Sequence, residues 1–407
     1  MRFAFRCYFR KIHVLGEENI PSSGPILMLC NHPNSFTEPM LLACFQKRTL
    51  NFLVRGDVFE NKFLNPILRH TYQIPIYRAR DGFENLRKNK STFEFVHQKL
   101  KQAHTVLIFP ESTTHLVRYL RPLQKGAAHI AIQSVQDYEM LNLLVIPCGV
   151  NYKNVIRAGE DVLIHIGKPI NISDWLKENS TVSDQAALLT ELFTREMNKV
   201  VHSIPSSMST KLYDDLSNVY IKSYDEDHLS EKHQSLIKSI SIKSEELNSM
   251  SKAYVPSRSE LPAIEFSLTQ SNTDKLLNLL KTIGAFLLGI PALFLYGIPL
   301  LISKKIAKSL IKKDEFKPPI RIVSGIVMCK LALIGFLIYI ILELGFAIGI
   351  LFAYLSILSI YFLLQFIYNA SLNKYLFSYT ISKNKIKLLG LRQRIIDTID
   401  DVTCHFK

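Results

Sequence analysis

Residues 25–39 read PILMLCNHPNSFTEP and give the clearest indication of the fold class. The segment starts with a short apolar run, as in a buried β-strand, and continues into a polar turn. His32 therefore comes directly after a strand, and Glu38 falls one turn into the helix expected next. Open α/β sheets place their sites at the carboxyl ends of their strands. We therefore expect an α/β sheet with His32 at its functional edge.

His32 and Glu38 are suited to acid–base chemistry. An imidazole can take the proton of a hydroxyl near neutral pH, which group transfer to an alcohol requires. A carboxylate beside it would hold the ring tautomer and stabilise the imidazolium. The simpler interpretations are a turn histidine before a proline and a first-turn acid favoured by the helix dipole. The rest of the chain is needed to choose between them.

Residues 1–205 alternate between short apolar runs and amphipathic segments, a pattern typical of an α/β domain. We predict strands at 25–30, 73–77, 105–109, 143–147 and 162–166. We predict helices at 83–103, 127–136 and 184–203. The fold class that follows is a mixed sheet flanked by helices.

Two further polar segments accompany these strands. The sequence IYRAR at 76–80 contains Arg78 and Arg80, whose guanidinium forks match the geometry of a phosphate. The plain alternative is a solvated loop. The sequence FPESTT at 109–114 places Glu111 and Ser112 at another strand end, where Glu111 could also be a helix-capping acid.

Together these segments resemble the glycerolipid acyltransferase family, which contains the lysophosphatidate and glycerol-3-phosphate acyltransferases. Coverage is about residues 10 to 205. The four family blocks occur in order and contain His32, Tyr77-Arg78, Phe109-Pro110-Glu111 and Val145-Ile146-Pro147. The resemblance implies a glycerolipid-acyltransferase-like fold and the transfer of a fatty acyl group from a thioester to glycerol 3-phosphate or lysophosphatidate.

The resemblance also implies a role for each block. His32 corresponds to the catalytic base, with Glu38 as its partner. The acceptor and its phosphate would be bound by Arg78, Arg80, Glu111, Ser112 and Lys125. Pro147 falls in the block usually assigned to the acyl chain or donor. No metal and no cofactor are expected; acyl-CoA or acyl-acyl carrier protein would be the co-substrate.

Two residues depart from the family pattern. The family has Asp after four residues, or after five in some members, whereas this chain keeps the five-residue spacing but has Glu38. Ser112 replaces the Gly that usually follows the third-block Glu, at a point of close backbone approach. No Gly-x-Ser-x-Gly elbow surrounds Ser112, which argues against a serine hydrolase.

Composition indicates an anionic partner. The net charge is +14, and the lysine clusters flank long apolar runs, so anionic membrane lipid is favoured over nucleic acid. The six cysteines occur singly, without the close pairs of zinc or redox sites. We therefore expect a membrane protein that does not bind nucleic acid.

The sequence predicts four parts: an acyltransferase domain at 1–205, a charged helical connector at 206–275, a membrane region at 276–371 and a basic tail at 372–407. Within the membrane region, 283–302 is an apolar segment with prolines, and 322–368 has the length of a helical hairpin. Glu343 and Gly345 would form its turn. The basic flanks predict a cytoplasmic location for both ends of the hairpin, and the family suggests a bacterial inner membrane.

This topology raises a conflict. A complete span at 283–302 would place the domain and the basic loop at 304–317 on opposite faces. A kinked, re-entrant or interfacial segment would resolve it. Two other functions stay open: a non-catalytic lipid-binding protein of the same fold, and an acyltransferase or hydrolase acting on another lipid.

Overall fold

The computed structural model describes the chain except residues 63, 78–88, 157, 222–228, 255–260, 375–378 and 405–407. It forms two compact units. The first comprises Met1–Arg2, Ile12–Val155 and Val162–Ser203, and the second comprises Phe3–Lys11, Ile156–Asp161 and Ile204–Lys407. The four-part division of the chain stays a prediction.

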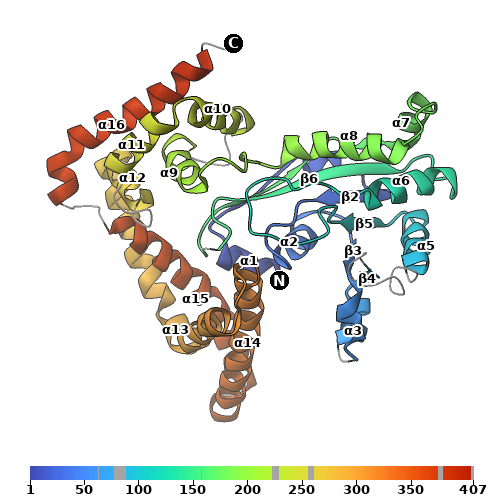
Figure 1. Ribbon diagram of the computed structural model, residues 1–407. Coiled ribbons are helices and arrows are strands. Elements are labelled where there is room, and N and C mark those ends of the chain that lie inside the picture. The colour runs from blue at the N-terminus through green and yellow to red at the C-terminus, as the bar shows by residue number, and fades with distance from the viewer. Residues whose placement is uncertain are drawn as a thin grey trace. The chain divides into compact units, whose positions relative to one another are not determined.

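A mixed eight-stranded sheet forms the centre of the first unit (Figure 1). Its strands are β1 (Ile12–Leu15), β2 (Ile26–Cys30), β3 (Leu50–Arg55), β4 (Gln73–Ile76), β5 (Thr105–Ile108), β6 (Leu144–Tyr152), β7 (Val162–Ile166) and β8 (Ile170–Asn171). The order is β1-β7-β6-β2-β5-β3-β4, and β8 pairs with β6. Neighbours are parallel except where β6 meets β7 and β8. The predicted mixed α/β sheet is confirmed.

The helices and 3-10 turns of this unit follow the strands along the chain. They are η1 (Glu17–Asn19), α2 (Thr37–Phe45), η2 (Gly56–Glu60), α3 (Leu64–His70), α5 (Asn89–Lys101), α6 (Gly126–Gln136), α7 (Ile172–Glu178) and α8 (Gln185–Val200). The part of the predicted helix 83–103 that precedes Asn89 lies outside the described residues.

Strand β2 lies at the centre of the sheet, between β6 and β5. All five of its residues are buried, which explains why its sequence is continuously apolar instead of alternating. Leu27 and Leu29 belong to the core formed with α5, α6 and α8. The strand therefore has a fixed position from which the next residues enter the site.

Three strands were not predicted from the sequence: β1, β3 and β8. Strand β3 reads LNFLVR, so Asn51 and Arg55 interrupt its apolar pattern. Strand β1 includes His13, and β8 has only two residues. Strand β6 continues to Tyr152, beyond the predicted end at Pro147, because its second half pairs with β7.

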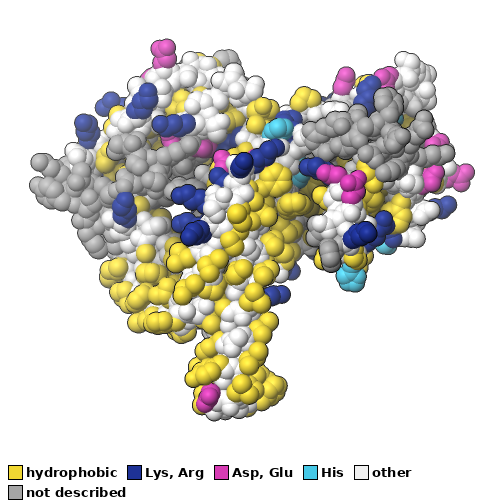
Figure 2. Space-filling view, turned by 60° about the horizontal axis from the view of Figure 1, so that its bottom comes forward, with side chains coloured by type: hydrophobic (Ala, Val, Ile, Leu, Met, Phe, Trp, Pro, Cys, Tyr) yellow, Lys and Arg dark blue, Asp and Glu magenta, His cyan; other side chains and the backbone are white. Residues whose placement is uncertain are grey.

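The second unit is helical. Its helices are α1 (Arg2–Tyr8, all but its first residue), α9 (Thr210–Tyr220), α10 (Leu229–Ile242), α11 (Ser244–Tyr254), α12 (Leu261–Thr269), α13 (Asn272–Leu310), α14 (Lys317–Leu344), α15 (Phe346–Asn373) and α16 (Tyr379–Cys404), with the turn η4 (Asp314–Phe316) before α14. Within the described part of the chain, three helices are long and apolar enough to cross a membrane: 272–310, 314–344 and 346–373. Figure 2 shows hydrophobic side chains gathered in the centre and lower part of the view. These helices support membrane association.

Candidate active site

The centre of the candidate site is a contact between His32 and Glu38. His32 follows β2, and Glu38 lies in the first turn of α2. His32 Nδ1 lies 3.0 Å from Glu38 Oε2. When Nδ1 donates to the carboxylate, the lone pair of the imidazole lies on Nε2, which can then accept a proton. The five-residue spacing and the longer Glu side chain thus produce a histidine–carboxylate pair.

Glu38 is held by two more hydrogen bonds. The backbone N–H of Asn34 donates to Oε2 at 3.1 Å, and the Tyr152 hydroxyl donates to Oε1 at 2.6 Å. The Glu38 side chain is completely buried, whereas 17% of the His32 side chain remains exposed. The imidazole is therefore partly open to solvent, and the carboxylate behind it is shielded from water.

Tyr152 was not identified from the sequence. Its only sequence signal is its place near the end of an apolar segment, and the contact with Glu38 depends on β6 lying beside β2. Burial raises the pKa of Tyr152 well above its ordinary value, and the negative charge of Glu38 adds to this effect. The phenol is therefore neutral and serves as a donor to Glu38.

The first and third family blocks meet through the sheet. Strand β5, which precedes Phe109, is hydrogen-bonded to β2 in parallel. The rings of His32 and Phe109 stack with centroids 4.1 Å apart. Phe109 thus covers one face of the imidazole. The motif that contains His32 and the motif that contains Phe109 therefore lie at one site, although they are distant in sequence.

Glu111 is buried in an ion pair with Arg121. The guanidinium Nε and Nη2 donate to Glu111 Oε2 at 3.1 and 2.6 Å. Arg121 also donates to the hydroxyl and carbonyl of Thr113. Burial raises the pKa of Glu111, while Arg121 and then His32 oppose the rise. Arg121, which the sequence did not single out, thus closes the loop between 111 and 121.

Ser112 adopts a left-handed backbone with φ of 59°. This conformation costs an L-residue about 1 to 2 kcal/mol, whereas glycine adopts it freely. The geometry explains why the family usually has Gly at this position. The Ser112 side chain is exposed and its backbone N–H donates to Phe109 O at 3.1 Å.

The other predicted site residues have different surroundings. Lys125 Nζ pairs with Asp184 Oδ2 at 2.8 Å, and both side chains are about half exposed. Pro147 is buried in β6 beside Leu29 of β2. Arg78 and Arg80 lie outside the described residues, so their predicted phosphate contacts stay a prediction.

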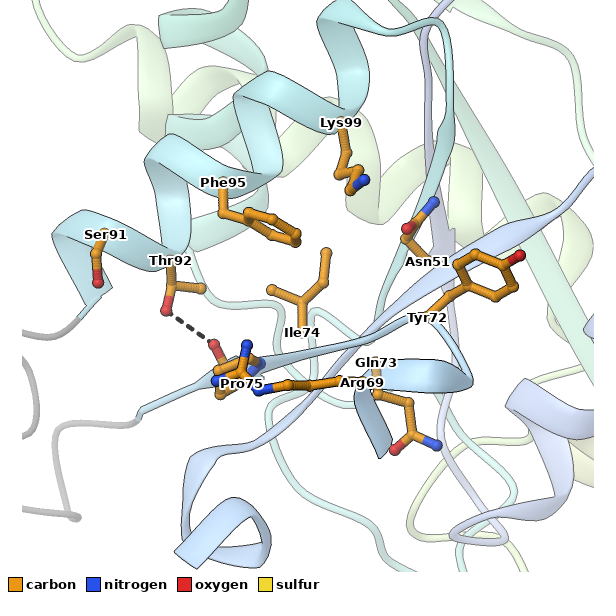
Figure 3. A pocket seen from close by; sticks show the side chains of 10 residues that line it. All are labelled: Asn51, Arg69, Tyr72, Gln73, Ile74, Pro75, Ser91, Thr92, Phe95 and Lys99. Atoms are coloured by element: carbon orange, nitrogen blue, oxygen red, sulfur yellow. Dashed lines mark hydrogen bonds between the residues drawn. The ribbon is translucent and has the colours of Figure 1, made fainter. Parts of the chain in front are cut away.

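A separate pocket of about 420 Å³ lies against β4 and α5 (Figure 3). Its charged lining residues are Arg69 and Lys99, and Ile74 and Phe95 supply apolar surface. None of the predicted site residues that the structure describes lines this pocket. It is therefore distinct from the His32–Glu38 pair.

Residues 11–151 match the acyltransferase family model. The chain is 19% identical over 249 residues to an uncharacterized acyltransferase of Schizosaccharomyces pombe, covering 40% of this chain and 37% of the relative. It is also 19% identical over 252 residues to glycerol-3-phosphate O-acyltransferase 1 of Saccharomyces cerevisiae, covering 41% and 33%. The chain thus matches only about a third of the length of these curated relatives.

Among solved structures, the 1-acyl-sn-glycerophosphate (LPA) acyltransferase PlsC from Thermotoga maritima is similar, with a TM-score of 0.33 and 18% identity. The similarity covers 46% of this chain and 70% of that one. The family match identifies residues 11–151 as an acyltransferase domain, and the similarity to a glycerol-3-phosphate O-acyltransferase supports a relationship to the glycerolipid acyltransferases.

Proposed function

We propose that this acyltransferase moves a fatty acyl group from an acyl thioester to a hydroxyl of glycerol 3-phosphate or lysophosphatidate in phospholipid biosynthesis. The observation that carries the proposal is the 3.0 Å contact between His32 and the fully buried Glu38. A base oriented in this way is what alcohol acylation requires. The donor is acyl-CoA or acyl-acyl carrier protein.

In this mechanism, His32 Nε2 takes the proton from the acceptor hydroxyl as its oxygen attacks the thioester carbonyl. The new ester C–O bond forms, the C–S bond breaks, and the imidazolium returns the proton to the departing thiolate. Glu38 stabilises the imidazolium between these two events, while Asn34 and Tyr152 keep the carboxylate in place. No covalent acyl-enzyme and no metal enter the scheme.

Acceptor recognition is assigned to the remaining blocks. Arg78, with help from Arg80 and Lys125, would bind the phosphate, as the family resemblance implies. Glu111 is held by Arg121, so we assign it the role of ordering the acceptor loop that includes Ser112. Pro147 would contribute to the acyl-chain or donor side. We place the domain at the cytoplasmic face of a bacterial inner membrane, a location that the basic flanks of the apolar helices support.

The test is an assay of the purified full-length protein in detergent. A labelled acyl-CoA and a labelled acyl-acyl carrier protein are each combined with glycerol 3-phosphate, lysophosphatidate or other lysolipids. We expect ester product from at least one of the two named acceptors. Release of free fatty acid alone would indicate a hydrolase, and no turnover with any combination would support a non-catalytic lipid-binding protein.

His32→Ala is the matched variant. Loss of a general base lowers turnover about 10²- to 10⁴-fold. His129→Ala is the control, because His129 is exposed on the surface of α6. If His32→Ala retains full turnover with an unchanged melting temperature, the assigned base is wrong.

A further inference from the structure

Most of the buried residues of helix α13 are small, whereas its exposed residues include many large apolar ones. Its buried positions include Thr282, Ala285, Gly289 and Ala292. The exposed side chains are Leu276, Leu277, Leu280, Ile283, Phe286, Leu287, Leu288, Leu293, Phe294, Ile298, Leu301, Ile302 and Leu310. Water-soluble helices bury their large apolar residues, whereas helices in lipid pack through small ones. The surroundings of α13 are therefore lipid.

The first part of α13 runs antiparallel to the second part of α15. Along α13, Asn278 contacts Asn373, the Ala292 N–H donates to Ser359 Oγ, and Tyr296 bonds to Ser356. The residue numbers of the contacts in α15 fall as the residue numbers in α13 rise, so the two helices run in opposite directions. A Cβ on Gly289 would lie 2.8 Å from Leu363 Cα, so the two backbones are in close contact.

The last part of α13 runs antiparallel to the first part of α14. Ser303 lies beside Gly325, since a Cβ on that glycine would be 3.6 Å from Ser303 Oγ. One turn earlier in α13, Leu300 packs against the buried cluster of Ala292, Tyr296 and Leu363. Cys329 and Leu333 of α14 pack against the same cluster. The neighbour of α13 thus changes from α15 to α14 at about Tyr296 to Ser303.

Helices α14 and α15 form a hairpin around Gly345. Gly349 packs against Ile341, and the rings of Phe336 and Phe352 are 6.4 Å apart. The two helices are therefore antiparallel to one another. Two antiparallel helices cannot both be antiparallel to a single straight third helix, so α13 cannot be a straight span in line with the hairpin.

The path of α13 relative to the hairpin follows from these directions. Its first part runs toward the Gly345 end, because the adjoining part of α15 runs away from it. Its last part runs back, because the adjoining part of α14 runs toward that end. Pro291 and Pro299 lie in this region, and prolines kink helices. Both ends of α13 therefore lie at the open end of the hairpin.

Ser359 stabilises this bend. Its hydroxyl accepts from the Ala292 N–H at 2.9 Å and donates to Leu288 O at 2.8 Å. In an unbroken helix this N–H and this carbonyl would bond to each other. The serine thus satisfies backbone groups that an opened helix would otherwise leave unpaired in lipid.

The charges agree with this path. Lys275 and Lys281 lie in the first three turns of α13. A basic cluster spans its other end, with Lys304, Lys305 and Lys308 in the last turns of the helix and Lys312, Lys313 and Lys317 after it. Glu343 is near the opposite, closed end of the hairpin. Basic residues gather on the cytoplasmic side of membrane helices. Both ends of α13 have such basic residues, as expected for two ends on the cytoplasmic side.

We infer that α13 is a re-entrant membrane helix whose two ends lie on the same face of a phospholipid bilayer. The acyltransferase domain before it and the basic loop after it then share one side of the membrane. This resolves the conflict that a complete span at 283–302 would create. The inference concerns topology and does not depend on the acceptor or donor of the reaction.

Single cysteines test this topology in the full-length protein with its native cysteines replaced. The labelled sites are Gln270→Cys before α13 and Lys312→Cys after it, both exposed positions. Ser183→Cys, also exposed, reports on the acyltransferase domain. A membrane-impermeant maleimide is applied to intact cells and to sealed inverted vesicles, and detergent gives total labelling. Membrane-bound acyltransferase activity or an unchanged melting temperature shows that each variant is folded.

We expect all three cysteines to be labelled in inverted vesicles and protected in intact cells. The same pattern with both orientations reversed would still place the ends of α13 on one face and support the inference. Labelling of Gln270→Cys and Lys312→Cys from opposite sides would show that α13 crosses the bilayer and would overturn it. Labelling of both from both sides of sealed membranes would overturn it as well, because α13 would then not be embedded.

Discussion

The hydroxyl of Tyr152 donates to Glu38 Oε1 at 2.6 Å, although the two residues are 114 positions apart in the chain. Glu38 in turn contacts His32 through its other oxygen. The phenol is therefore linked to the proposed base through the carboxylate, and we predict that Tyr152 is a positioning residue. Its raised pKa keeps it protonated well into the alkaline range.

Tyr152→Phe removes this donor and keeps the ring. Because hydrogen bonds to charged groups contribute about 1.5 to 3 kcal/mol, we expect kcat to fall about tenfold or more, with little change in the acceptor KM. Steady-state kinetics with the folded variant measure both constants. Tyr72→Phe, at an exposed tyrosine, should behave as wild type. An unchanged kcat for Tyr152→Phe would exclude a positioning role.

Glu38→Gln and Glu38→Asp separate charge from side-chain length. The amide removes the charge that stabilises the imidazolium, so kcat should fall by at least about 10²-fold, as in carboxylate-to-amide changes of catalytic triads. Acceptor KM should change little. The aspartate keeps the charge and shortens the reach, so measurable activity should remain. If the glutamine variant turns over normally while His32→Ala is inactive, Glu38 is only a first-turn acid of α2.

Ser112→Gly should stabilise the protein. The residue adopts φ of 59°, and glycine relieves about 1 kcal/mol of backbone strain at such a position. We expect a rise in melting temperature of about 2 to 4 °C in detergent. Ser249→Gly, at an exposed position within α11, should lower the melting temperature, because glycine weakens a regular helix. A lower melting temperature for Ser112→Gly would contradict the assigned strain.

His97 should make the protein less stable in mild acid. Its ring is buried, Nδ1 bonds to Ser134 Oγ at 2.9 Å, and burial lowers its pKa. The unfolded chain, with an ordinary histidine pKa of about 6.5, then binds the proton more readily than the folded protein. Stability should therefore fall as the pH drops below about 6.5 and continue to fall until the folded pKa is passed.

Thermal melts between pH 7.5 and 5 check this for the wild type and His97→Gln. Glutamine can still bond to Ser134 and does not titrate, so the acid loss should be smaller in the variant. Some loss should remain, because burial also lowers the pKa of His165. If the melting temperatures of the two proteins fall equally between pH 7.5 and 5, His97 does not cause the loss of stability in acid.

The sequence by itself determined the local features of this protein. A continuous apolar run predicts a buried central strand such as β2, and the residues that directly follow it, including His32 and Glu38, keep their spacing in any fold. Residue identity also shows which helices are apolar enough for a membrane, because the bilayer sets a length and a composition. Strands whose pattern is broken by polar residues, such as β3, escape this kind of prediction.

Only the tertiary structure decided which distant residues complete the site and how the membrane helices run. Tyr152 reaches Glu38 because β6 lies beside β2, and Arg121 closes on Glu111 through a loop without regular periodicity. The two directions of α13 follow from its contacts with different neighbours. Strand order and helix pairing depend on packing between segments that are distant in the sequence. Hydrophobic periodicity within one segment does not predict them.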